Sequence, residues 1–295
     1  MLAYACLSLL LAASQAASSI LLGTAALDGQ ENPILVDARP KAAYEAGHLP
    51  GALNLDPDGL SEERDGVQNM LRPAKALQAE VQALGLRPDK TLVIYSDMAA
   101  PDDTKRATRL FWALEYLGFP HVALLDGGFA KWTAEGRSTA TGSAPAPVAG
   151  STTFELEARP ELLTNYEQVV TNIQTSQGCL LDLRSAEEYA GLTKKPFLNQ
   201  AGHISGASNV EATSLVEKQE LNGKVFYTFA KAESLKPSLL EAVGDWNKPV
   251  ITYCNSGRDA TVGYFGLRME GHENVSVYDG SMAEWDHKQA PAVKE

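Results

Sequence analysis

The chain has 295 residues and a mass of 31.6 kDa, which fits one large domain or two of ordinary size. Hydrophobic residues make up 44% of it and charged residues 21%, values that argue against a disordered chain or a fibrous repeat. A formal net charge of −12 disfavours nucleic acid as a partner, and three cysteines are too few for a disulfide scaffold of this size.

Residues 1–27 contain no Lys, Arg, Asp or Glu. An apolar block at residues 7–13 precedes small residues, a pattern typical of a secretory signal that is cleaved near Ala16 or Ala17. We therefore expect residues 1–17 to be a signal peptide, a periplasmic or otherwise exported protein, and no stable membrane insertion after processing. Two alternatives stay open. The uncharged run is long enough for an uncleaved anchor, and a misassigned start would leave the protein in the cytoplasm.

After a first strand predicted at residues 20–23, the chain repeats itself once. The repeated landmarks are an apolar run that ends in Asp-x-Arg (34–39, 180–184), a Gly-His-x-x-Gly-Ala motif (47–52, 202–207), a second strand (91–95, 249–253) and a closing Asp-Gly-x-x-x-x-Trp motif (126–132, 279–285). Each landmark returns after about 155 residues, and a constant offset of this kind indicates a tandem duplication.

Short strands rich in Val, Ile and Leu alternate with helical patterns in each half. Residues 105–117 place Leu110, Leu114 and Leu117 on one helical stripe, and residues 261–269 form a second helix-like stretch. This alternation predicts an α/β fold in which a parallel sheet is flanked by helices. Residues 137–150 are rich in Ser, Thr, Gly and Pro. We therefore predict domains at 20–137 and 152–295, joined by a linker at 138–151.

Cys254 directly follows the predicted strand of the second half. The next residues form a short loop that leads into a helix, and ligands of open α/β sheets bind at such strand ends. Loop amides around Gly257 and the helix dipole are expected to stabilise a thiolate and to lower its pKa. The matching loop of the first half, residues 95–101, has no cysteine, so we expect a single nucleophile.

Together these features resemble the tandem-domain rhodanese family of sulfurtransferases, over nearly all of the chain after about residue 21. Besides the repeated motifs, residues 253–260 match Tyr-Cys-x-x-Gly-x-x-Ala. The resemblance implies two rhodanese-like α/β domains, an inactive first domain with Asp in place of Cys, and a persulfide on Cys254. Thiosulfate or 3-mercaptopyruvate would donate the sulfur, and cyanide or another thiol would accept it. No cofactor is implied, and the sequence shows no metal-ligand spacing.

Two other interpretations of the Cys254 loop are open. A Cdc-type phosphatase has the same fold but requires Cys-x5-Arg, and Ala260 occupies the position of that Arg, which disfavours this class. A non-enzymatic sulfur carrier or redox-binding partner in the cell envelope would form a persulfide but turn over small donors negligibly.

The loop does not identify the donor. Thiosulfate-type loops resemble Cys-Arg-Lys-Gly and mercaptopyruvate-type loops resemble Cys-Gly-Ser-Gly, whereas this chain has Asn255 and Ser256. Arg258 is expected to hold a donor anion bidentately, with a solvated loop charge as the alternative, while Asp259 partly cancels its field. A basic contact that family members carry after Asp-x-Arg falls at Glu188, a second departure.

The expected site therefore consists of the nucleophile Cys254 and of substrate contacts from Arg184, Arg258, Asn255, Ser256, Gly257, Asp259 and Ala260. For Arg184, a structural pairing with Asp182 is nearly as well supported. Other prominent residues are expected to be structural, namely Cys179 as a core thiol, Arg39 as a structural twin of Arg184, His48 and His203 as turn residues, Trp132 and Trp285 as core residues, and Lys194 and Lys195 as a solvated run.

Overall fold

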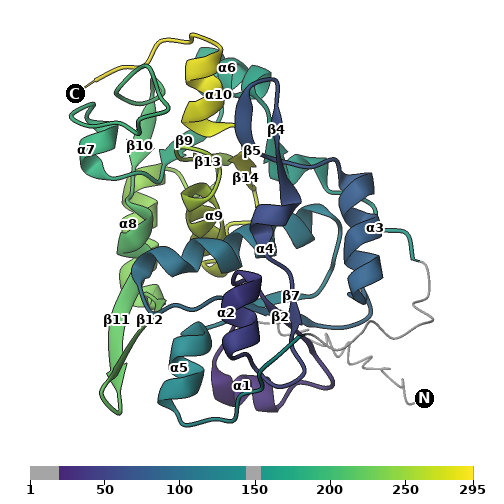
Figure 1. Cartoon of the computed structure of the whole chain (residues 1–295). Coiled ribbons are helices and arrows are strands. Elements are labelled where there is room, and N and C mark those ends of the chain that lie inside the picture. Colours follow the sequence, from purple (N-terminus) through teal and green to yellow (C-terminus); the bar gives the residue numbers. More distant parts are fainter. Residues whose placement is uncertain (1–19, 144–153, 295) are drawn as a thin grey trace, which may run out of the picture.

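The computed structural model describes residues 20–143 and 154–294 (Figure 1). The expected signal peptide and residues 144–151 of the expected linker lie outside the described residues, so cleavage and export stay predictions. Residues 138–143 lie against the first domain, where Ala140 forms a β-bridge with His48. Residues 154–159 also contact the first domain, since the Arg159 amide donates to the Tyr116 carbonyl oxygen over 2.7 Å.

The first domain contains a parallel sheet of five strands in the order β1-β7-β6-β2-β3, counted over the described residues. Its strands are β1 (Leu21–Leu22), β2 (Ile34–Asp37), β3 (Leu53–Asn54), β6 (Leu92–Tyr95) and β7 (Val122–Leu125). Its helices are α1 (Thr24–Asp28), α2 (Lys41–Ala46), α3 (Ala74–Leu84), α4 (Thr104–Tyr116) and α5 (Gly128–Ala134). Strands β6 and β7 are buried along their whole length, as expected for a parallel sheet with both faces covered.

The second domain repeats this arrangement with the order β10-β9-β13-β14-β8. Its sheet strands are β8 (Leu163–Thr164), β9 (Cys179–Asp182), β10 (Ala207–Asn209), β13 (Val250–Tyr253) and β14 (Val275–Tyr278). Its helices are α6 (Tyr166–Thr175), α7 (Ala186–Tyr189), α8 (Ala232–Val243), α9 (Asp259–Met269) and α10 (Ser281–His287). The two sheets have the same strand order, which confirms the predicted α/β fold in two repeats.

Each domain also carries an antiparallel hairpin that the sequence did not indicate. The additional elements are β4 (Ser61–Arg64) and β5 (Val67–Leu71) in the first domain, β11 (Val216–Leu221) and β12 (Lys224–Phe229) in the second, and the 3-10 helices η1 (Pro57–Leu60), η2 (Pro101–Asp103), η3 (Pro160–Leu162) and η4 (Ala212–Leu215). Each hairpin contacts the other domain. The Leu71 amide donates to Asp279 Oδ2 over 2.6 Å, and the Phe229 amide donates to Asp126 Oδ1 over 3.0 Å. Asp126 and Asp279 occupy the same position of the repeat, so each domain binds the hairpin of the other through an equivalent aspartate.

Helices α4 and α9 form the centre of the domain interface (Figure 1). The ring of Phe111 on α4 meets Phe265 on α9 edge to face, with centroids 4.9 Å apart. One turn away, the hydroxyl oxygens of Thr108 and Thr261 lie 2.9 Å apart. Helix α9 starts just after the Cys254 loop, so the first domain packs directly behind the expected site.

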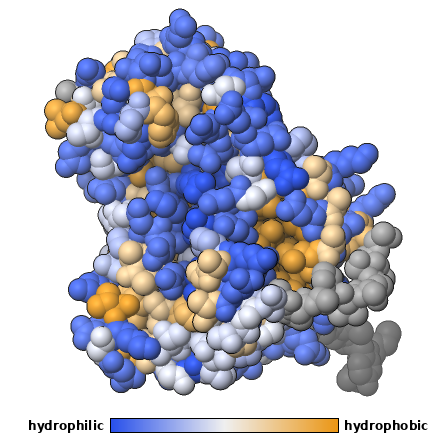
Figure 2. Space-filling model, in the orientation of Figure 1, coloured by the Kyte–Doolittle hydropathy of each residue, from blue (hydrophilic) through white to orange (hydrophobic). Residues whose placement is uncertain are grey.

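The surface where the two lobes meet is mostly hydrophilic (Figure 2). Among the described helices, none is both long and apolar enough to cross a bilayer.

Candidate active site

Strand β13 places Cys254 at the carboxyl edge of the second sheet, as the sequence predicts. Preceding it, Tyr253 is fully buried, and its hydroxyl oxygen accepts from the Ile204 amide over 3.1 Å. Following it, the Met282 and Ala283 amides of α10 donate to the carbonyl oxygens of Cys254 and Asn255. The start of the loop is therefore fixed on one side by the Tyr253 side chain and on the other by backbone hydrogen bonds from α10.

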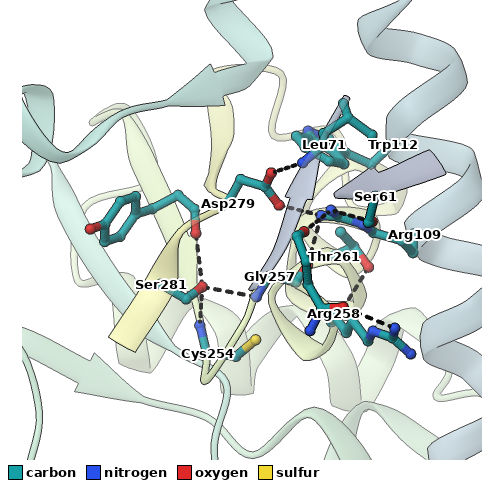
Figure 3. A network of polar contacts seen from close by, with 12 residues as sticks. Ser61, Leu71, Arg109, Trp112, Cys254, Gly257, Arg258, Thr261, Asp279 and Ser281 are labelled. Carbon is teal, nitrogen blue, oxygen red and sulfur yellow. Dashed lines mark hydrogen bonds and ion pairs between the residues drawn. The ribbon is translucent and has the colours of Figure 1, made fainter. Parts of the chain in front are cut away.

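Ser281 holds the loop in its turned shape (Figure 3). Its Oγ accepts hydrogen bonds from the amides of Cys254 and Gly257, each over 3.1 Å, and donates to the Tyr278 carbonyl oxygen over 2.8 Å. Gly257 has φ of 78°, and a Cβ there would lie 2.5 Å from Asp279 Oδ1. Only glycine fits this position. The Gly257 amide thus contacts Ser281, whereas it was expected to contact substrate.

The sulfur of Cys254 is almost fully buried, with 1% of the residue exposed. The amides of Ser256 and Ala260 and the Ser281 hydroxyl act to lower its pKa, as the sequence predicts for this loop. Burial nevertheless raises the pKa of the thiol to about 11, and the carboxylate of Asp259 adds to that rise. The expectation of a lowered pKa is therefore wrong for this structure, because desolvation of the charged form outweighs the hydrogen bonds.

Replacing Asp259 by Asn is expected to lower the pKa of Cys254, because it removes the negative charge that opposes the thiolate. Only the thiolate reacts, so alkylation of wild-type Cys254 by iodoacetamide should accelerate about tenfold per pH unit between pH 7 and pH 10. In D259N the whole curve of alkylation rate against pH should be displaced to lower pH. Mass spectrometry of the Cys254 peptide measures both curves.

The matched control is Asp245→Asn, which changes an exposed carboxylate next to α8. Its alkylation curve should coincide with that of the wild type. Coincident curves for D259N and the wild type would contradict the electrostatic role of Asp259.

A cavity of about 420 Å³ opens beside the Cys254 loop. The loop contributes Asn255, Ser256, Arg258 and Asp259. Helix α7 contributes Glu188, and the segment that follows this helix contributes Thr193, Lys194, Lys195 and Phe197. The first domain adds Asp102 and Lys105. The cavity therefore brings together most of the predicted loop residues and also Glu188, which the sequence marked only as a departure from the family.

The two predicted arginines make ion pairs within the protein. Arg184 donates from Nε and Nη2 to Asp182 at 2.6–3.1 Å, and it is 2% exposed. Arg39 pairs with Asp37 in the same way in the half that has no nucleophile. This shared geometry supports the structural alternative for Arg184, although the residue also borders the cavity.

Arg258 reaches toward the first domain. Its Nη2 lies 2.7 Å from Asp58 Oδ1 and 3.2 Å from Asn69 Oδ1. In Figure 3 its side chain extends away from the Cys254 sulfur. A role in binding donor anions would require Arg258 to leave these partners.

The first domain supports the loop through Arg109 of α4, which the sequence analysis missed (Figure 3). Its Nη1 lies 2.5 Å from Asp279 Oδ1 and 3.2 Å from the Gly257 carbonyl oxygen, and its Nη2 donates to the Asn69 carbonyl oxygen over 2.9 Å. Arg109 and Asp279 are both nearly buried, at 3% and 2% exposed side chain. A residue of the first domain thereby holds the Cys254 loop of the second.

The first-domain loop places Ser96 at the position of Cys254. The Ser96 carbonyl oxygen accepts from the Phe129 amide, as that of Cys254 accepts from Met282. The family resemblance implied an Asp there, but Asp97 comes one position later, so this implication is corrected. Ser281 likewise corresponds to Gly128. The sequence could have indicated its role in holding the Cys254 loop, because only the repeat that contains the cysteine has a serine at this position.

The remaining predictions concern structural residues. The imidazole rings of His48 and His203 stack on Tyr44 and Tyr189 at 3.8 Å, in matching turns. Trp132 and Trp285 are buried. Cys179 begins β9 half-buried, and burial raises the pKa of its thiol. Burial confirms Trp132 and Trp285 as core residues, whereas Cys179 lies at the margin of the core. Both cysteines of the described part are free thiols.

A family model described as the rhodanese-like domain matches residues 24–135 and 165–288. The chain belongs to the rhodanese-like domain family. Both domains of this rhodanese-like protein match separately, in agreement with the duplication in the sequence. Sulfur transfer is therefore the class of activity that the family membership supports.

Three relatives illustrate this class. The rhodanese-like chain is 29% identical to thiosulfate/3-mercaptopyruvate sulfurtransferase 2 of Arabidopsis thaliana, over 87% of this chain and 75% of the relative. It is 31% identical to a thiosulfate sulfurtransferase of Pseudomonas aeruginosa, over 89% and 92%. It is also 31% identical to the sulfur carrier protein TtuD of Thermus thermophilus, over 82% and 83%.

Among solved structures, the chain resembles a complex of EanB, in its Y353A form, with ergothioneine. The TM-score is 0.80 at 21% identity, with 94% of this chain and 70% of the other covered. At this identity the similarity shows the shared fold.

Proposed function

We propose that the protein is a sulfurtransferase that carries sulfane sulfur on Cys254 as a persulfide, from thiosulfate or 3-mercaptopyruvate to a thiophilic acceptor. The observation that carries the proposal is the Cys254 loop. A single repeat has the thiol, at a strand end beside a polar cavity, with the amides of Ser256 and Ala260 directed at its sulfur.

In the first step, the Cys254 thiolate attacks the outer sulfur of the donor. A bond forms between the two sulfur atoms while the bond that held the outer sulfur breaks. Thiosulfate then leaves as sulfite, and 3-mercaptopyruvate leaves as the enolate of pyruvate. In the second step, the acceptor attacks the outer sulfur of the persulfide, and the electron pair of the broken S–S bond returns to Cys254. This covalent route divides one transfer into two steps and requires ping-pong kinetics.

The amides of Ser256 and Ala260 stabilise negative charge on the sulfur during both steps. Such preorganised donors act strongly in a buried site, where the effective dielectric constant is low. The raised pKa of Cys254 means that the resting enzyme holds a neutral thiol at pH 7. Deprotonation of Cys254 is therefore part of the barrier to loading.

Incubation with each donor in turn, followed by intact-mass measurement, tests the proposal. We expect a gain of one sulfur atom on the peptide that contains Cys254, its loss after cyanide is added, and formation of thiocyanate. Absence of a mass gain with both donors would contradict the proposal. The donor with the higher kcat/KM would identify the preferred substrate.

A second function, that of a sulfur carrier, is supported by the similarity to the carrier protein of Thermus thermophilus. A carrier would show the same mass gain, but negligible turnover with cyanide or small thiols. Steady-state kinetics on the loaded protein separates the two functions.

A further inference from the structure

The carboxylates of Glu188 and Asp259 line the cavity, where they do not help to bind an anionic sulfur donor. Glu188, with 10% of its side chain exposed, accepts a hydrogen bond at Oε1 from Asn255 Nδ2 over 3.1 Å. Asn255 is adjacent to Cys254 in the sequence, and Asp259, which lines the same cavity, lies close enough to raise the pKa of the thiol. Two carboxylates therefore line the cavity beside the Cys254 loop.

The cations of the cavity leave these carboxylates incompletely paired. The charged residues that line it are Asp102, Lys105, Arg184, Glu188, Lys194, Lys195, Glu211, Arg258 and Asp259. Both arginines have closer acidic partners elsewhere, in Asp182 and Asp58. The ammonium groups nearest to the two carboxylates are those of Lys195, 3.8 Å from Glu188 and half-exposed, and Lys105, 3.8 Å from Asp259. Lys105 lies closer to Asp102, at 2.9 Å.

The amide of Asn255 adds an acceptor without a donor. Its Oδ1 is buried and has no hydrogen-bond partner among the described residues, while the residue as a whole is 5% exposed. A buried acceptor that stays unpaired is costly, so a ligand that brings an N–H group stabilises this site. Thiosulfate offers only acceptor oxygens and negative charge, and it satisfies neither Asn255 nor the carboxylates.

We propose that the physiological acceptor is an aminothiol, a thiol that carries a positively charged nitrogen near its sulfur, and that Glu188 determines this specificity. The inference rests on the proposed sulfurtransferase activity and names its acceptor class. The ammonium group lies against Glu188 and Asn255 Oδ1. In a zwitterionic aminothiol the carboxylate faces Lys194 and Lys195, which line the same cavity.

The transfer balances without an external oxidant. The acceptor thiol loses its proton to solvent, and its sulfur attacks the outer sulfur of the Cys254 persulfide. The new S–S bond makes the acceptor a persulfide, and Cys254 recovers the electron pair as a thiolate.

The test uses the full chain, loaded with sulfur, and three small thiols that differ in charge, namely cysteamine, 2-mercaptoethanol and 3-mercaptopropionate. Values of kcat/KM are calculated on the thiolate concentration, which corrects for the different acidity of the free thiols. We expect wild-type protein to prefer cysteamine over 3-mercaptopropionate by about tenfold, and Glu188→Gln to lose most of this preference. The neighbouring, exposed Glu187→Gln is the control and should keep the wild-type ratio.

The possible outcomes separate the acceptor inference from the proposed sulfurtransferase activity. A wild-type protein that loads sulfur but shows no preference, or prefers the anionic thiol, overturns the acceptor inference and leaves the sulfurtransferase intact. A preference that E188Q retains in full overturns the role of Glu188. If E188Q does not fold, the wild-type preference should fall as salt rises, and a salt-independent preference overturns the charge mechanism. Absence of loading with any donor overturns the proposed function itself.

Discussion

Cys254→Ser is expected to reduce sulfur transfer to the uncatalysed background with every donor. A serine hydroxyl forms no persulfide, so neither the loading step nor the unloading step can occur. No other thiol can replace it within the described domains, because Cys179 lies at the other end of the sheet. Cys179 pairs with Val250 at the start of β13, whereas Cys254 follows its last residue. Donor-dependent thiocyanate formation and the persulfide mass gain both measure the effect.

Cys179→Ser is the matched control for this variant. Its thiol lies within hydrogen-bond range of the Leu180 and Ala242 carbonyl oxygens, and Cys179 is not among the residues that line the cavity. Its activity should stay near the wild-type level, and its persulfide should still map to Cys254. Transfer by C254S at more than the background rate would remove the covalent mechanism, provided that thermal unfolding shows both variants to be folded.

Most of the fold could be predicted from the sequence because it depends on local patterns. The helical stripe at residues 105–117 corresponds to α4, and the apolar run at 249–253 corresponds to β13. The constant offset between the motifs required two domains of one topology, and the parallel sheets confirm it. The hairpins β4–β5 and β11–β12 could not be predicted in this way. Many of their residues are polar or exposed, and their ends are held by hydrogen bonds to the opposite domain.

The site was predictable only in part, for the same reason. Cys254 follows from its position after a buried strand. The pKa of its thiol depends on burial by the surrounding chain and on Asp259, and neither effect follows from the loop sequence alone. The backbone support from Arg109 comes from the other domain, at a distance of 170 residues from Asp279 in the sequence. Charge patterns within one helix do not reveal a partner in another domain. The pairing of Arg109 with Asp279 depends on how the two domains pack, which the local sequence does not show.

The pair of Arg109 and Asp279 gives the second large effect. Removing one member of a buried ion pair leaves the other charge buried without compensation, at a cost of about 3–5 kcal/mol. Arg109→Met should therefore lower the free energy of unfolding by this amount in a urea titration. It should also slow persulfide formation, because Asp279 and the Gly257 carbonyl oxygen lose the guanidinium that fixes the loop.

Arg106→Met provides the comparison on the same helix. Arg106 pairs with Asp56 and Asp58, but its side chain is 25% exposed, and surface pairs of this kind contribute about 1 kcal/mol or less. The double variant R109M/D279N should recover part of the stability lost in R109M, because no unpaired charge then stays buried. An R109M protein as stable as R106M, or a double variant less stable than the two single losses combined, would show that the interdomain ion pair does not hold the active loop. A stability loss without slower loading would instead confine Arg109 to joining the domains, since the loop would then keep its shape without the guanidinium.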